Sequence, residues 1–189
     1  DNKNFSSYLD TINKQIKDIE YLVNEFSDFA RMPKPILKKI DIYKIIYQSF
    51  NLNKLSNPKI EFKISNNKSS NLIEGDEEQL NRVFLNLIKN SIESIEEKLI
   101  KNVDFKGKIT IDIKEDSDYI YVSITDNGEG FEKVDKVKML TPYFTTKKKG
   151  TGLGLAVVTK IINDHNSSIL FTSINEGAKV EIIIPKYND

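Results

Sequence analysis

The sequence predicts an α+β fold, a sandwich of helices on a mixed sheet preceded by one long coiled-coil-like helix. Three observations support this prediction. Apolar residues near the start of the chain recur in alternating steps of four and three, as in an amphipathic helix that packs in a bundle. From residue 41 onward, helical periodicity alternates with strand-like alternation of apolar and polar residues. Between these parts, Pro33 and Pro35 interrupt any helix.

The first segment is predicted to be one helix about 45 Å long, at 1.5 Å per residue. Its apolar positions are Phe5, Leu9, Ile12, Ile16, Ile19, Val23, Phe26 and Ala30. Such a stripe needs a partner, either the rest of the chain onto which the helix folds back, or another helix. The strict 3.5-residue repeat favours bundle packing or dimerisation. The prolines place a hinge at residues 32–36.

From residue 41 onward, the chain is predicted to contain both helices and strands. Its helices are expected at 41–55, at 77–99 with Asp76 as N-cap, and at 153–164. Strands are expected at 59–65, 108–114 and 119–125, followed by a hairpin of 168–174 and 179–184. The lysine-rich stretch 131–149 has little periodicity and is expected to be a mobile loop.

Composition excludes several classes of function. The 189 residues suffice for one sizeable core with a helical appendage. Lys plus Arg and Asp plus Glu number 28 each, so nothing indicates a nucleic-acid partner. Without cysteine and with one histidine, neither disulfides nor a zinc site are expected. No apolar run approaches the ~18 residues of a membrane span. The chain begins at Asp1 rather than Met, so we expect it to be part of a longer protein.

Two glycine-bearing stretches and a pair of asparagines carry the chemistry. Asp126 ends an apolar strand, where a carboxylate can accept a hydrogen bond from the amine of adenine. The stretch 150–155 leads into a helix, whose free amides and positive end suit a polyphosphate. Asn86 and Asn90 lie four residues apart in one row on a helix, and amide oxygens are neutral ligands for Mg²⁺. Each signal alone is also compatible with a turn or a solvated surface, but together they indicate a nucleotide site.

Four stretches resemble the boxes of the sensor histidine kinases of two-component systems. Residues 86–90 resemble the N box, 126–130 the G1 box, 142–147 (Pro-Tyr-Phe-Thr-Thr-Lys) the F box and 150–155 the G2 box. Residues 26–33 are similar to the junction after the second dimerisation helix in the nitrogen-regulation branch of that family. The resemblance covers roughly residues 36–185 and implies the Bergerat-type (GHKL) ATP-binding fold.

The resemblance assigns a role to each matching residue. Asn90 would coordinate Mg²⁺ through its amide oxygen, and Asn86 would support the phosphate and metal site. Asp126 would hydrogen-bond adenine. The other residues expected to bind ATP are Gly128, Gly130 and Phe131 around the base, Tyr143, Phe144 and Lys147 in the lid, and Gly150, Thr151, Gly152, Leu153, Gly154 and Leu155 at the phosphates and lid base.

The resemblance also implies an organisation and partners. Residues 1–31 would be part of a dimerisation and phosphotransfer hairpin, 32–36 the hinge and 37–189 the catalytic domain. The implied enzyme is a protein histidine kinase that transfers the γ-phosphoryl of ATP to a histidine, for phosphorelay to a response regulator. It would be a homodimer through the N-terminal helix and the cytoplasmic portion of a bacterial sensor anchored in the inner membrane.

One departure concerns the phosphoacceptor. No phosphoacceptor motif occurs in the chain, and its single histidine, His165, matches a turn after the G2 helix. We expect His165 to serve the fold through local hydrogen bonds, and the chain to bind ATP without phosphorylating itself.

Two alternatives remain open at this stage. A gyrase- or Hsp90-like ATPase would need a carboxylate to activate water where this chain has Asn86. The second alternative is a nucleotide-gated interaction module without catalysis. Only an activity assay distinguishes such a module from a kinase.

Overall fold

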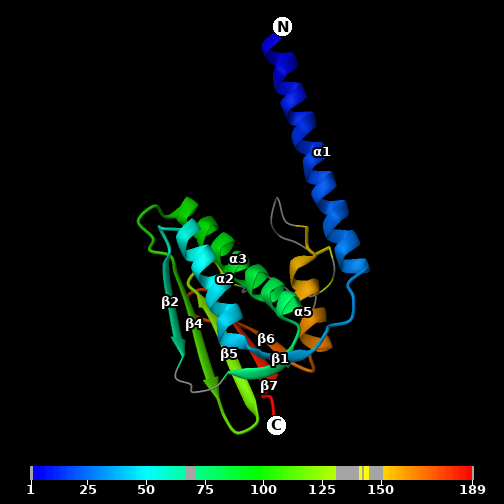
Figure 1. Cartoon of the computed structure of the whole chain (residues 1–189). Coiled ribbons are helices and arrows are strands. Elements are labelled where there is room, and N and C mark those ends of the chain that lie inside the picture. Colours follow the sequence, from blue (N-terminus) through cyan, green and yellow to red (C-terminus); the bar gives the residue numbers. More distant parts are fainter. Residues whose placement is uncertain (1, 67–70, 131–140, 142, 145–150, 189) are drawn as a thin grey trace.

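The computed structural model describes residues 2–66, 71–130, 141, 143–144 and 151–188, without the side chains of residues 2–6, 18, 21, 25 and 28. Helix α1 (Asn2–Ala30) projects away from the remainder of the chain, which forms one layered domain (Figure 1). As predicted, the helix ends before Pro33.

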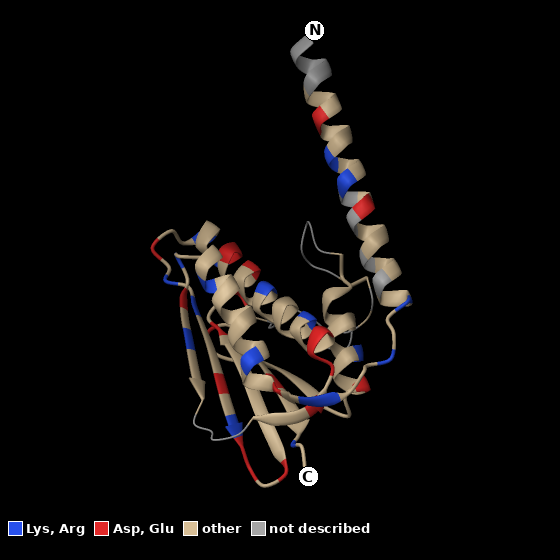
Figure 2. Cartoon of the chain, viewed as in Figure 1, with Lys and Arg blue, Asp and Glu red and all other residues tan. Residues whose placement is uncertain are grey.

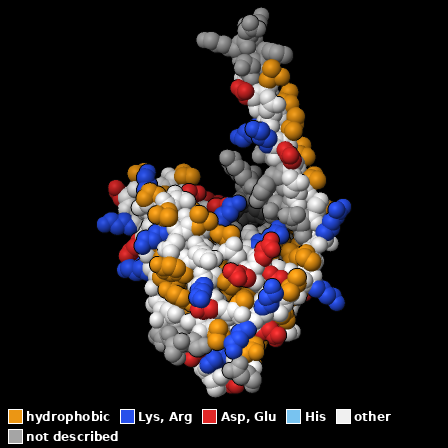
Figure 3. All heavy atoms as spheres, viewed as in Figure 1, with side chains coloured by type: hydrophobic (Ala, Val, Ile, Leu, Met, Phe, Trp, Pro, Cys, Tyr) orange, Lys and Arg blue, Asp and Glu red, His pale blue; other side chains and the backbone are white. Residues whose placement is uncertain are grey.

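The apolar stripe of α1 is exposed along the described part of the helix. Its members from Leu9 to Phe26 are between 44% and 58% exposed, so the helix does not fold back to cover them. Figure 3 shows these side chains as one line along the helix.

The domain contains a mixed five-stranded sheet. Its strands, in spatial order, are β2 (Glu61–Asn66), β4 (Lys108–Glu115), β5 (Tyr119–Asp126), β7 (Ala178–Pro185) and β6 (Ser168–Ser173). β2 pairs with β4 in parallel, and the other neighbours are antiparallel. The predicted strands are therefore all present, with ends that differ by one or two residues.

A second, two-stranded sheet was not predicted. Here β1 (Lys38–Asp41) pairs antiparallel with β3 (Leu72–Gly75). Each strand has four residues, too few for the alternation of apolar and polar residues to stand out from the neighbouring loops.

Three helices cover one face of the large sheet: α2 (Ile42–Ser56), α3 (Glu77–Lys101) and α5 (Gly154–Asp164) (Figure 1). The inward-facing strand residues alternate with half-exposed ones, so the core lies between this face and the helices. Fully buried members of the core include Ile46, Phe84, Ile88, Ile111, Val122, Val157, Ile161 and Ile182.

The predicted N-cap Asp76 connects three segments of the chain. Its Oδ1 accepts a hydrogen bond from the backbone N–H of Gln79 in the first turn of α3, at 3.1 Å. Its Oδ2 accepts from the N–H of Ile36, at 2.9 Å. The side-chain amide of Gln79 also donates to the carbonyl of Pro33, at 3.0 Å. The start of α3 thus holds the segment that joins α1 to the domain.

His165 is buried at the end of α5 and has a structural role, as expected. Its Nδ1 lies 2.8 Å from the carbonyl oxygen of Ile161, within the same helix. Its Nε2 accepts from the backbone N–H of Asp76, at 2.9 Å. Because Nε2 accepts, the proton belongs on Nδ1, which donates to Ile161. The second bond joins α5 to the start of α3 and was not predicted, because 89 residues separate the two partners.

Basic and acidic residues are interspersed along α1 and the domain (Figure 2). Within the described residues, no helix combines the length and the apolar character needed to cross a membrane.

Candidate nucleotide-binding site

Asn86 of the N-box stretch and Gly154 of the G2 stretch lie close together where α3 meets α5. Asn86 and Asn90 are both half-buried on α3. The side-chain amide of Asn86 donates to the carbonyl of Arg82 at 2.9 Å. Its Oδ1 faces the start of α5, where a Cβ added to Gly154 would lie 3.1 Å away. A larger residue at position 154 would therefore press on the asparagine.

The N-terminus of α5 has the features of an anion site. The helix begins at Gly154, and within the described residues no side chain caps its first turn. The hydroxyl of Thr151 accepts from the N–H of Leu153, at 3.3 Å, just before the helix. The first backbone N–H groups of a helix have no partner inside it, and the helix dipole favours negative charge there. A phosphate group fits this chemistry.

The described part of the F box lies against the G2 stretch. The N–H of Tyr143 donates to the carbonyl of Gly152 at 3.1 Å. Gly152 has φ of 70°, and a Cβ there would lie 2.5 Å from the carbonyl carbon of Tyr143. Only glycine fits this position without displacing the backbone of Tyr143 and Phe144. Tyr143 itself has φ of 69°, and its ring centroid lies 6.2 Å from that of Phe26 in α1.

Asp126 lies at the end of β5 and is only 6% exposed. Its Oδ1 accepts from the N–H of Gly128 at 2.9 Å, which turns the chain immediately after the strand. Gly130 lies against the turn of the β6–β7 hairpin, because a Cβ added to it would lie 2.6 Å from the carbonyl oxygen of Gly177. The G1 stretch is thus anchored at both ends of its described part.

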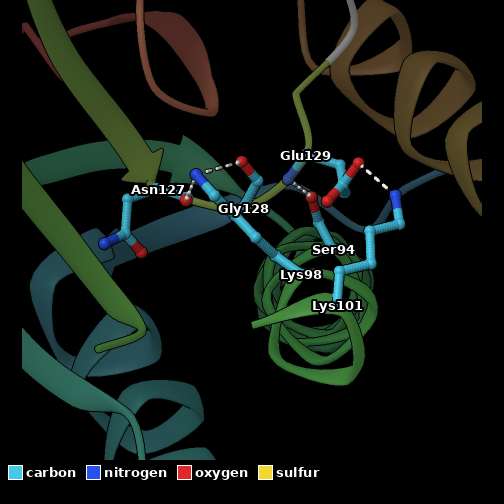
Figure 4. Close-up of polar contacts among 6 residues, drawn as sticks. All are labelled: Ser94, Lys98, Lys101, Asn127, Gly128 and Glu129. Atoms are coloured by element: carbon cyan, nitrogen blue, oxygen red, sulfur yellow. Dashed lines mark hydrogen bonds and ion pairs between the residues drawn. The ribbon is translucent and has the colours of Figure 1, made fainter. Parts of the chain in front are cut away.

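Sequence reasoning missed the residues of α3 that hold the G1 stretch (Figure 4). The hydroxyl of Ser94 accepts from the N–H of Glu129 at 2.9 Å. The ammonium of Lys98 donates to the carbonyls of Asn127 at 2.8 Å and Gly128 at 3.3 Å. A usable signal was present, because Ser94 and Lys98 continue the four-residue spacing of Asn86 and Asn90 along the helix.

Several predicted positions lie outside the described residues. These are Phe131, Lys147 and Gly150, together with most of the loop 131–149. Their expected roles stay predictions.

The donors present fit Mg²⁺ bound together with phosphates. In the described parts of the chain, no group of three or more acidic or histidine side chains could hold a metal ion. Asn90 follows Asn86 by about one turn of α3, and its side chain carries a neutral amide oxygen. Mg²⁺ commonly takes one or two protein oxygens and completes its shell with phosphates and water.

Comparisons with known proteins agree with this geometry. The sequence model of the family described as "Histidine kinase-, DNA gyrase B-, and HSP90-like ATPase" matches residues 75–188. Nitrogen regulation protein NtrY of Azorhizobium caulinodans is 35% identical over 177 residues, which cover 94% of this chain and 23% of that protein. The chain spans 23% to 36% of the length of the first curated relatives that it matches.

Two solved structures show the same architecture. The nucleotide-free catalytic domain of histidine kinase ThkA is 27% identical, with a TM-score of 0.69 over 79% of this chain and 95% of that one. The structure of ThkA in complex with the response regulator TrrA has a TM-score of 0.76 over 95% of this chain and 51% of that one. At 23% identity, this second likeness is one of fold alone.

Proposed function

The chain belongs to the family of histidine kinase-, DNA gyrase B- and HSP90-like ATPases, as the ATP-binding domain of a sensor histidine kinase, and we propose that it binds ATP with Mg²⁺ and donates the γ-phosphoryl to a histidine. One observation carries this proposal: the uncapped start of α5 lies against Asn86 of α3. The first backbone N–H groups of α5 and the amide oxygen of Asn86 thus lie close together.

Asp126 supports the choice of adenine. A nearly buried carboxylate accepts a hydrogen bond from the exocyclic amine of adenine, whereas guanine presents a carbonyl at that position. The Oδ1 bond to Gly128 fixes the plane of the carboxylate before the base binds. With GTP, the carboxylate would face another acceptor where adenine places a donor.

The phosphate end combines Asn86, Asn90 and the start of α5. Asn90 would hold Mg²⁺ through its amide oxygen, and the ion would neutralise charge on the phosphates. Asn86 keeps its own amide oriented through Arg82 and lines the start of α5. An amide cannot accept a proton from water at neutral pH, so Asn86 favours phosphoryl transfer over the hydrolysis of gyrase-like relatives.

The partners follow from the same proposal. The exposed stripe of α1 would form a homodimer in the full-length protein. The product would be a phosphohistidine that passes its phosphoryl group to a response regulator, the kind of protein bound to ThkA in the solved complex. The chain would be the cytoplasmic portion of an inner-membrane bacterial sensor.

Calorimetric titration with ATP, ADP and GTP in the presence of Mg²⁺ tests nucleotide binding. We expect GTP to bind at least about 10-fold more weakly than ATP, because guanine places an acceptor opposite the carboxylate where adenine places a donor. Asp126→Asn keeps an oxygen for the N–H of Gly128 but loses the charge, so ATP affinity should fall about 10-fold or more with little change in melting temperature. Asp112→Asn, on β4, is the matched control. Equal affinity for ATP and GTP would contradict the role of Asp126.

Label transfer tests the kinase reaction. The chain is mixed with [γ-³²P]ATP and a longer version of the protein that contains the acceptor histidine and carries Asn90→Ala. We expect acid-labile label on the longer chain and none on the shorter one, since His165 is buried and bonded at both nitrogens. Binding of ATP without any transfer would favour the non-catalytic nucleotide-gated module.

A further inference from the structure

We propose that Lys98 is a positioning residue for adenine recognition, which holds the peptide group that orients the carboxylate of Asp126. The inference rests on the proposed function, because it names a residue that acts on the same site. It goes beyond the four boxes, since Lys98 lies two turns after Asn90 on α3 and belongs to none of them.

The ammonium of Lys98 is held in one place. It donates to the carbonyl oxygens of Asn127 and Gly128, at 2.8 and 3.3 Å. It also lies over the ring of Phe105, 4.5 Å from the ring centroid. An ammonium has three N–H donors and no acceptor, so two carbonyls and an aromatic face account for the directions in which it can interact. This half-buried lysine is therefore engaged with the protein rather than with solvent.

One peptide group links Lys98 to Asp126. The carbonyl of Asn127 and the N–H of Gly128 belong to the same peptide plane. Lys98 donates to its oxygen, and its N–H donates to Oδ1 of Asp126 at 2.9 Å. A cation at the oxygen fixes the orientation of the plane and strengthens the N–H as a donor. The position of the adenine-reading carboxylate thus depends on a side chain of α3.

Ser94 places the same loop on the same helix. Its hydroxyl accepts from the N–H of Glu129, and Gly128 is packed so closely that an added Cβ would overlap the Ser94 side chain. Figure 4 shows Ser94 and Lys98 extending from α3 toward Gly128 and Glu129. Since Asn86 and Asn90 are on this helix as well, α3 sets the distance between the base end and the phosphate end of the site.

Lys101 offers a matched control one turn further along α3. Its ammonium pairs with the carboxylate of Glu129 at 2.6 Å, but the two side chains are 64% and 31% exposed. It contacts a side chain and not the backbone of the loop. Exposed ion pairs of this kind contribute little to the free energy of folding. Both lysines lie in the last turn of α3, so replacing either one removes the same charge from the helix end.

The first test compares nucleotide affinities of Lys98→Met and Lys101→Met. We expect Lys98→Met to lower the affinity for ATP about 10-fold and the affinity for GTP much less, so that the preference for ATP becomes smaller. Lys101→Met should change both affinities by less than about twofold. Lys98→Arg, which keeps the charge and several donors, should restore most of the preference. If Lys98→Met does not fold, Lys98→Gln, which has no ammonium, is measured in its place.

The second test asks whether Lys98 acts through Asp126. In a double-mutant cycle, Lys98→Met should have little effect on ATP affinity when Asp126 is already Asn. Losses that add, or an unchanged ATP preference in a folded Lys98→Met chain, would overturn the inference while the wild-type chain still binds ATP. If the wild-type chain binds no ATP, the proposed function itself fails, and the two failures are thereby distinguished.

Discussion

At the scale of single residues, Asp76 shows how much one carboxylate can connect. Burial favours its neutral form, but the backbone N–H groups of Ile36, Gln79 and Glu78 donate to the carboxylate and outweigh burial. These hydrogen bonds hold the pKa of Asp76 below its ordinary value. The sequence predicted the cap from an Asp before a helical pattern. The sequence could not predict the hydrogen bond from Ile36, because its two partners lie 40 residues apart in the chain.

The lowered pKa of Asp76 gives stability a dependence on pH. The unfolded chain binds the proton more tightly, so the contribution of Asp76 is complete above about pH 4 and is lost as the pH falls through the folded-state pKa. Asp76→Asn keeps one oxygen for the N–H of Gln79 but loses the acceptor for the N–H of Ile36. It should therefore lower the free energy of unfolding by about 1–2 kcal/mol at pH 7, and the difference from wild type should narrow below about pH 4. Urea unfolding of the wild-type and Asp76→Asn chains at several pH values measures this difference in the free energy of unfolding.

Asp41→Asn is the control for that experiment. Asp41 caps α2 by accepting from Tyr43 within its own helix, so we expect a smaller loss at pH 7. A gap between wild type and Asp76→Asn that stays constant from pH 7 to pH 3 would contradict the assignment.

At the scale of elements, α3 supports the whole described site. Its predicted extent was nearly correct, because Leu80, Phe84 and Ile88 repeat at helical spacing and an N-cap precedes them. The resemblance assigned Asn86 and the start of α5 to one phosphate site, which stays a prediction, and the structure places the two close together. The contacts of Ser94 and Lys98 were not, because a serine and a lysine on a helix ordinarily face solvent and only the packing of β5 against α3 gives them partners.

The close approach of α5 to α3 makes Gly154→Ala informative. The new methyl group would lie 3.1 Å from Oδ1 of Asn86, so the asparagine must move. Alanine is at least as good a helix former, so the free energy of unfolding should be unchanged or higher by up to about 1 kcal/mol. We expect ATP affinity to fall about 3- to 10-fold nonetheless.

Thr159→Ala, in the middle of the same helix, is the control for helix propensity. It should leave ATP affinity unchanged, as measured by calorimetry beside a thermal melt. Full affinity in the Gly154→Ala chain would show that Asn86 does not line the phosphate site.

At the scale of the whole molecule, α1 is the element that leaves an apolar stripe exposed. The heptad spacing predicted the helix and its apolar stripe, and the prolines predicted where it ends. The direction of the helix could not be read from the sequence. It depends on the hold of Asp76 and Gln79 on the connecting segment and on the contact of Phe26 with Tyr143.

The exposed stripe leads us to expect that the chain self-associates through α1. Ile16→Glu places a charge in the middle of the stripe and should raise the dimer dissociation constant by at least about 100-fold, since a buried Ile contributes roughly 1.5–3 kcal/mol and a buried charge costs more. Sedimentation velocity over a range of concentrations measures the dissociation constant.

Asn13→Glu, an exposed position between two stripe residues, should have little effect. A wild-type chain that stays monomeric at high micromolar concentration would contradict self-association through this helix alone.

The buried histidine also provides a reporter. His165 is the single histidine in 189 residues, so its imidazole gives one isolated set of proton signals in an NMR spectrum. The ring is bonded to the last turn of α5 and to the first residue before α3. Any change in how these two helices meet, caused by nucleotide at one side or by movement of α1 at the other, would shift signals that can be followed without labelling the protein.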